Sequence, residues 1–322
     1  MFGRRNRKDV VPSDGWDAVL AVLFPDGLDD GQIAGIRAAI AGAAPSPSAA
    51  RRALGSVDQQ TIPSPVTIRW GAADIDAVDV GGILLTLDRA DASVSIQIAE
   101  GAYEPHVAAT LDRLLAPGDV FVDIGANIGY HSVRAATVVG PSGRVVAVEA
   151  NPENARLIAH TIEVNAMTNV QLLPIAVADR WGFVNFGSHV GSNGGFLPAD
   201  RLMSGRGTVV PTVPLDDLGL DQVSVVKIDV EGAEGIVIDG SSSMIEQQRP
   251  VFVMEFSIEM TTRVSERSAE AHLQRFVDWG YSISVIDRVS GTPDRTESVD
   301  QLLSTWGDLL RIEDLLLQPD ER

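Results

Sequence analysis

The hydrophobic pattern of the chain changes at about residue 119. From there to residue 286, short apolar runs alternate with stretches whose apolar residues recur at helical spacing. This alternation is typical of a parallel sheet covered by helices on both faces, and we therefore predict a doubly wound α/β fold. The predicted strands are Val120–Ile124, Arg144–Glu149, Val170–Leu173, Val223–Asp229, Val251–Phe256 and Ser282–Ile286. The predicted helices are His131–Val139, Pro152–Asn165, Ala233–Ile245 and Glu266–Trp279.

The first 65 residues follow a different pattern. Between Trp16 and Ala43, apolar residues fall near helical spacing and are interrupted at Pro25-Asp-Gly27, which predicts two helices. Proline- and serine-containing segments at 44–48 and 61–65 indicate linkers. We expect residues 1–65 to form a helical appendage with its linker and residues 66–322 to form the main domain. Within the main domain, Ile83–Leu87 and Val94–Ile98 predict leading β-strands.

A glycine-containing turn, Gly125-Ala-Asn-Ile-Gly129, follows the strand predicted at Val120–Ile124. The glycines let the backbone turn tightly and approach a ligand, and the next helix presents unpaired N–H groups to the same place. Glu149 ends the following strand, where its carboxylate can accept hydrogen bonds from ribose hydroxyls. The set favours a nucleotide-type cofactor, although a structural turn and an exposed strand-end carboxylate remain alternatives. Asn151 is predicted to cap the helix that Pro152 opens.

The acid before the turn distinguishes between cofactors. A nicotinamide dehydrogenase normally carries G-x-G-x-x-G, whereas Asn127 stands where the middle glycine would be. Asp123 would repel a pyrophosphate but would attract the ammonium group of S-adenosylmethionine (SAM). The turn therefore favours SAM, with a nicotinamide-dependent oxidoreductase as the first alternative.

A second cluster ends the strand predicted at Val223–Asp229. Side chains two apart share one face of a strand, so Lys227, Asp229 and Glu231 should point together toward the carboxyl end of the sheet. They are the catalytic candidates, and a charge network with only a structural role is the competing interpretation. His131 begins the helix after the glycine turn and is assigned no role.

Composition narrows the possible partners. The net charge of −19 would repel nucleic acid but suits a cationic ligand. With no cysteine, disulfides and thiolate metal sites are excluded. No apolar run approaches the roughly 18 residues of a membrane span, and we expect a cytoplasmic protein.

Several motifs together resemble the FkbM family of methyltransferases over roughly residues 100–256. They are Gly101-Ala-Tyr-Glu-Pro105, Asp123-Ile-Gly-Ala-Asn-Ile-Gly-Tyr-His131, Val148-Glu-Ala-Asn-Pro-Glu153, Ile175-Ala-Val-Ala-Asp179, Leu215-Asp-Asp-Leu218, Lys227-Ile-Asp-Val-Glu-Gly-Ala-Glu234 and Arg249-Pro-Val-Phe-Val-Met-Glu255. The family commonly has Glu-Pro-Asn where this chain has Glu149-Ala-Asn151.

The resemblance implies a Rossmann-like, SAM-dependent enzyme that methylates hydroxyl groups of sugars or natural products. It implies that the cofactor is held by Asp123, Gly125, Asn127, Gly129, Glu149, Ala178 and Asp179. It also implies that Lys227, Asp229 and Glu231 lie beside the transferring methyl. The segment Gly187–Gly195, with His189 and Asn193, resembles the family's variable substrate loop.

The sequence leaves three questions open. Asp229, Glu231 and Glu255 could hold Mg²⁺, which takes oxygen ligands. A non-catalytic scaffold built on the cofactor fold is the second alternative, and the sequence leaves the oligomeric state undecided.

Overall fold

The computed structural model describes residues 75–88, 91, 93–190, 193–196, 207–265, 267–295, 298–306 and 311–320. The appendage and linker predicted at residues 1–65 lie outside this range, so their structure stays a prediction. No helix in the described ranges is long and apolar enough to span a bilayer.

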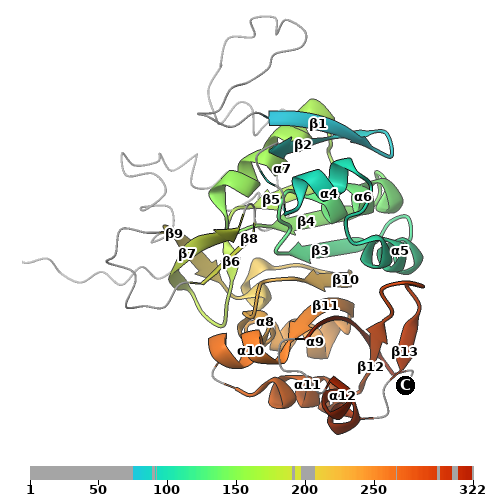
Figure 1. The fold of residues 1–322 in the computed structure, drawn as a ribbon, viewed down its shortest axis with the longest axis vertical. Coiled ribbons are helices and arrows are strands. Elements are labelled where there is room, and N and C mark those ends of the chain that lie inside the picture. The colour runs from blue at the N-terminus through green and yellow to red at the C-terminus, as the bar shows by residue number, and fades with distance from the viewer. Residues whose placement is uncertain are drawn as a thin grey trace, which may run out of the picture. The chain divides into compact units, whose positions relative to one another are not determined.

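An eight-stranded sheet forms the centre of the described region (Figure 1). In order across the sheet, its strands are β13 (Pro293–Arg295), β12 (Tyr281–Ile286), β14 (Ile312–Pro319), β11 (Val251–Ser257), β10 (Val223–Ile228), β3 (Val120–Ile124), β4 (Arg144–Val148) and β5 (Val170–Leu173). The strands from β11 to β5 are parallel, whereas β14 runs antiparallel to both of its neighbours. All six predicted strands are present, and no predicted end differs from the observed one by more than one residue.

Both faces of this sheet are covered by helices. Val253 of β11 belongs to a buried cluster with side chains of α5 (Pro105–Leu114) and α6 (Tyr130–Val139). Its neighbour Phe252 packs against Phe276 of α11 (Ala269–Asp278), with ring centroids 5.2 Å apart. Because successive side chains of a strand point to opposite faces, these contacts put α5 and α6 on one face and α11 on the other. The predicted doubly wound α/β fold is confirmed.

The remaining helices refine the prediction. They are α7 (Pro152–Val164), α8 (Glu234–Asp239), α9 (Ser242–Gln248), α10 (Ile258–Val264), α12 (Val299–Trp306) and the 3₁₀ helix η2 (Leu215–Leu218). The single helix predicted at Ala233–Ile245 is wrong, because the chain breaks at Gly240 between α8 and α9. A Cβ at Gly240 would lie 2.0 Å from the carbonyl oxygen of Ala178, so the break lets the chain pass close to that segment. The predicted cap of α7 is confirmed, since the Asn151 side chain accepts a hydrogen bond from the Glu153 amide.

The segment before the sheet contains a strand hairpin and a short helix. β1 (Ile75–Val80) and β2 (Ile83–Asp88) pair antiparallel. The strand predicted at Val94–Ile98 is wrong, because Ser95–Ala99 forms helix α4. The carboxylate of Asp91 accepts hydrogen bonds from the backbone N–H groups of Ser93 and Ser95, which opens a helical turn. Val94 and Ile98 are then buried one turn apart, while Ile96 is exposed.

A second, four-stranded sheet is inserted in the chain between β5 and β10. Its order is β6 (Ala176–Val177), β9 (Thr208–Val213), β7 (Gly182–Val190) and β8 (Asn193–Phe196). The hydrophobic pattern predicted no strand in this stretch, and the family resemblance implied only a variable substrate loop at Gly187–Gly195. The insertion matters for function because it contributes to the pocket described next.

Candidate active site

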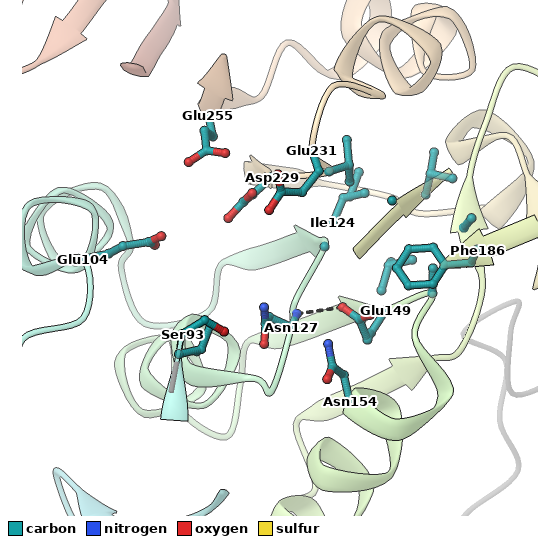
Figure 2. Close-up of a pocket in the computed structure, with 18 of the residues that line it drawn as sticks. Ser93, Glu104, Ile124, Asn127, Glu149, Asn154, Phe186, Asp229, Glu231 and Glu255 are labelled. Atoms are coloured by element: carbon teal, nitrogen blue, oxygen red, sulfur yellow. Dashed lines mark hydrogen bonds between the residues drawn. The ribbon is translucent and has the colours of Figure 1, made fainter. Parts of the chain in front are cut away.

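A pocket of about 320 Å³ lies at the carboxyl ends of β3, β4 and β10 (Figure 2). After β3 the chain continues toward β4, whereas after β10 it continues toward β11 on the other side. The pocket therefore lies at the switch point of a doubly wound sheet, where such folds bind ligands. Its volume is within the roughly 300–1,000 Å³ typical of small-molecule sites.

The glycine turn forms the centre of the pocket. Gly125 has φ +82°, and a Cβ there would lie 1.8 Å from the carbonyl oxygen of Asp229, so this position requires glycine to let two strand ends meet. The backbone N–H of Asn127 donates to Glu149 Oε2 at 2.7 Å. Gly125 and Asn127, two of the residues expected to hold the cofactor, line the pocket, whereas Gly129 is the N-cap of α6 and lies against Ile158.

Glu149 is held by the backbone on both sides. Besides the Asn127 bond, its Oε1 accepts from the Asn151 N–H at 2.7 Å. Burial raises the pKa of Glu149 to about 8, although these backbone hydrogen bonds oppose the rise. The carboxylate lines the pocket with a fixed orientation, which suits a contact to ribose hydroxyls.

The wall next to Glu149 is apolar and comes largely from the inserted region. Ile175, Val177 and Phe186 line it. Ala178 and Asp179, which the resemblance implied as cofactor residues, follow directly in the chain but are not among the lining residues. The candidates His189 and Asn193 lie in β7 and β8, and their side chains lie outside the described part of the structure.

Asp123 is buried away from the pocket. Its side chain points beneath α6, where Oδ2 accepts a hydrogen bond from the Ser132 hydroxyl at 2.6 Å. Asp123 lies on the same face of β3 as Phe121, which packs against α5 and α6. The structure therefore brings Asp123 near the turn but not into the pocket lining, and the expected contact with the SAM ammonium group lacks support from its position.

The predicted catalytic cluster forms an ion pair and a neighbouring acid. Lys227 is buried and donates to Asp229 Oδ2 at 2.8 Å. Burial alone would lower the pKa of Lys227, but Asp229, Glu104 and Asp123 more than offset this and raise it. Asp229 and Glu231 line the pocket, whereas Lys227 lies behind them. Burial raises the pKa of Asp229 against the opposing effect of Lys227, and burial with the charge of Asp229 raises that of Glu231.

Two further acids complete this end of the pocket. Glu255, at the end of β11, lines it, and its pKa is raised well above the ordinary value by burial and by the charge of Asp229. Glu104, which precedes α5, also lines it and received no role from the sequence, although Gly101-Ala-Tyr-Glu-Pro105 was one of the resembling motifs. The sequence signal that could have identified Glu104 as a pocket residue is its position directly before Pro105, the proline that opens a helix.

The geometry gives no support to a magnesium site. Within the described residues, no group of three or more His, Asp or Glu side chains is arranged to hold a metal ion, so Asp229, Glu231 and Glu255 do not form one.

Residues 123–283, half of the chain, match the family model described as the methyltransferase FkbM domain. The chain belongs to the FkbM methyltransferase family. The matched FkbM domain extends from Asp123 in β3 to Ile283 within β12 and so includes every acid of the pocket except Glu104.

Curated relatives of the FkbM chain are also methyltransferases by name. This chain is 29% identical over 85 residues to protein-L-isoaspartate O-methyltransferase 2 of Archaeoglobus fulgidus, and the match covers 26% of this chain and 39% of that protein. It is 39% identical over 72 residues to the isoaspartate enzyme of Methanopyrus kandleri, covering 21% and 32%. The chain thus spans only about a third to two fifths of these relatives.

Among solved structures, the FkbM methyltransferase of Methylobacillus flagellatus shares 16% identity at a TM-score of 0.41, covering 63% of this chain and 44% of that one. The precorrin-6y C5,15-methyltransferase of Geobacter metallireducens shares 17% at 0.38, covering 66% and 86%. The sequence matches establish the family and leave the activity and the acceptor to be inferred.

Proposed function

We propose that this protein is a SAM-dependent methyltransferase that methylates a hydroxyl group of a sugar or a natural-product-type small molecule. The observation that carries the proposal is the division of one pocket into two chemically different ends. One end combines apolar side chains with Glu149, and the other gathers Glu104, Asp229, Glu231 and Glu255.

The residues present fit SAM. The apolar wall of Ile175, Val177 and Phe186 suits an adenine ring. Glu149 accepts backbone hydrogen bonds from Asn127 and Asn151 and a side-chain bond from Asn154, and its carboxyl group still lines the pocket, where it can meet a ribose hydroxyl. The acidic end suits the positive sulfonium and ammonium groups of SAM. When bound, SAM would supply an electrophilic methyl group.

The acids give the chain a means of removing a proton. Asp229 or Glu231 would accept the proton that the acceptor hydroxyl loses on methylation. Lys227 keeps Asp229 oriented through the 2.8 Å contact. Their raised pKa values make both carboxylates better proton acceptors than free ones. Alignment of the acceptor oxygen with the methyl would supply much of the remaining acceleration.

The charge of the pocket favours a neutral acceptor. A carboxylate acceptor would meet ionised Glu104 beside Asp229, Glu231 and Glu255, whereas a hydroxyl brings no charge. Arg288 also lines the pocket, but its side chain is half exposed and lies 3.7 Å from the carboxylate of Asp314. A nicotinamide cofactor fits less well, because the Asn127 N–H that could face a pyrophosphate is bound to Glu149.

The test is methyl transfer to matched acceptors. The protein is incubated with methyl-labelled SAM and pairs of sugars or hydroxylated natural products that differ only in carrying a hydroxyl or a carboxyl group. We expect label in the methyl ethers alone. Label in methyl esters alone would refute the acceptor assignment, and the absence of calorimetric heat on titrating SAM into folded protein would refute the cofactor assignment.

A further inference from the structure

Glu104 has a backbone conformation that its local structure does not explain. It has φ 38° and ψ 53° and immediately precedes Pro105 at the first position of α5. A non-glycine residue rarely adopts this left-handed conformation. A residue at this position normally accepts a hydrogen bond from the first turn of its helix, but the Glu104 side chain makes no such bond. Neither helix capping nor turn geometry accounts for the acid.

The Glu104 side chain is held by His131 instead. Glu104 Oε2 lies 2.7 Å from His131 Nε2, and the His131 ring is buried. The rings of Tyr103 and Tyr130 pack against His131, with centroids 5.9 and 5.1 Å away. Among the described residues, His131 makes the one hydrogen bond to this carboxylate, which also lines the pocket and is partly exposed to it. His131 thus fixes the Glu104 carboxylate while leaving it able to accept a further hydrogen bond from a ligand in the pocket.

The charge of Glu104 differs from that of the other pocket acids. Burial would raise its pKa, but the hydrogen bond from His131 and the charge of Lys227 lower it to about 2. The pKa values of Asp229, Glu231 and Glu255 are raised instead. Glu104 therefore stays ionised at every working pH, which suits contact with a cation better than exchange of a proton.

The position of Glu104 identifies that cation. In Figure 2, Glu104 and Glu149 lie on opposite sides of Asn127, and both point into the pocket. If Glu149 binds the ribose, the amino-acid part of SAM crosses the turn at Gly125–Asn127 and ends near Glu104. This inference rests on the proposed function. We infer that Glu104 binds the α-ammonium group of the methionine part of SAM and that His131 is its positioning residue, a role that buried Asp123 does not fill.

The test uses two ligands that differ in the ammonium group. S-adenosylhomocysteine carries it but has no sulfonium charge, and 5′-methylthioadenosine lacks the whole amino-acid end. By isothermal titration calorimetry, Glu104→Gln should weaken binding of S-adenosylhomocysteine roughly 10–100-fold, as expected for loss of a charge-assisted hydrogen bond. Binding of 5′-methylthioadenosine should stay within about twofold, because uncharged groups distant from the change keep their contacts.

Four variants control for folding and charge. Glu104→Gly removes the carboxylate but favours the positive φ, so it should unfold at or above the wild-type temperature and still lose affinity for S-adenosylhomocysteine. His131→Leu should show the same ligand selectivity, because Glu104 loses its orienting partner, and His131→Gln should restore part of it. Glu100→Gln removes an exposed acid four residues earlier and should change neither affinity.

Each outcome decides the inference. Unchanged S-adenosylhomocysteine binding by Glu104→Gln and Glu104→Gly, in a wild type that binds it, overturns the role of Glu104 and leaves the proposed function standing. Equal weakening of both ligands also overturns it, because a structural role would act on both. A wild-type protein that binds neither ligand overturns the proposed function itself.

Discussion

Lys227→Met tests whether the acid cluster depends on its single buried ammonium group. The Lys227 side chain is 6% exposed and Asp229 is 19% exposed, so the pair is largely shielded from water. Methionine keeps most of the length of the side chain and removes the charge. Removal of one partner of a buried pair costs about 3–5 kcal/mol, because the other charge is left uncompensated. We expect a loss of this size in the free energy of unfolding at pH 8.

The assay is urea unfolding followed by tryptophan fluorescence, performed as a double-mutant cycle. Asp229→Asn and the double variant Lys227→Met/Asp229→Asn complete the cycle. The double variant should be more stable than the sum of the single losses predicts, by about 0.5–3 kcal/mol, because no uncompensated partner remains. Additive losses, or a Lys227→Met loss below about 1 kcal/mol, would refute the reasoning.

The pH dependence gives a second check on Lys227. Lys227 lowers the pKa of Asp229 against the larger effect of burial, so its removal raises that pKa further. An acid whose pKa is higher in the folded than in the unfolded protein stabilises the fold fully at pH values below its unfolded-state pKa. This stability is lost as the pH rises through the folded-state pKa. The deficit of Lys227→Met should therefore be smaller at pH 5 than at pH 8. An equal deficit at both would mean that Lys227 acts by packing.

Three further predictions concern the turn, the acid and the ribose contact. Gly219→Ala should lower the free energy of unfolding by about 1–2 kcal/mol, because Gly219 has a left-handed backbone with open space around it. Gly125→Ala should lower it more, because its Cβ would lie 1.8 Å from a carbonyl oxygen, and equal melting temperatures of the two variants would contradict this. Asp229→Ala should cut turnover about 10²–10⁴-fold while the SAM dissociation constant changes less than turnover, and full activity would remove Asp229 from the mechanism. Burial raises the pKa of Glu149 from 4.5 to about 8, so protonated Glu149 stabilises the wild type at low pH, and this stability is lost as the pH rises from 4.5 to 8. The stability deficit of Glu149→Gln should therefore narrow between pH 5 and pH 8.5, and a widening deficit would contradict this sign.

The parallel strands could be predicted because they are buried on both faces and appear as continuous apolar runs, such as Val120–Ile124. The link between the glycine turn and Glu149 could also be predicted, because adjacent parallel strands bring their carboxyl ends together. Those two signals are local to neighbouring elements. They are sufficient to predict the fold class and the part of the pocket that contains Glu149.

The remaining features depend on contacts that the pattern does not encode. Val94–Ile98 alternates like a strand, yet the Asp91 carboxylate opens a helix there. The position of β14 between β11 and β12 is a long-range pairing without a local signal. Which face Asp123 occupies depends on α6, which covers it through Ser132. Glu104 reaches the pocket because the His131 contact fixes it across 27 positions of chain.

The four-stranded insertion has an evolutionary consequence. Its strands pair only with one another, so the eight-stranded ladder is complete without them. Yet Phe186 and Gly195 of the insertion line the pocket, whereas Glu104, Asp229, Glu231 and Glu255 come from elsewhere in the chain. If the pocket binds SAM as proposed, exchange of the insertion during evolution would change the contacts to the cofactor without changing the acids that would carry out the reaction. Chimaeras that exchange residues 182–213 between relatives should therefore change the affinity for SAM independently of the rate of the chemical step.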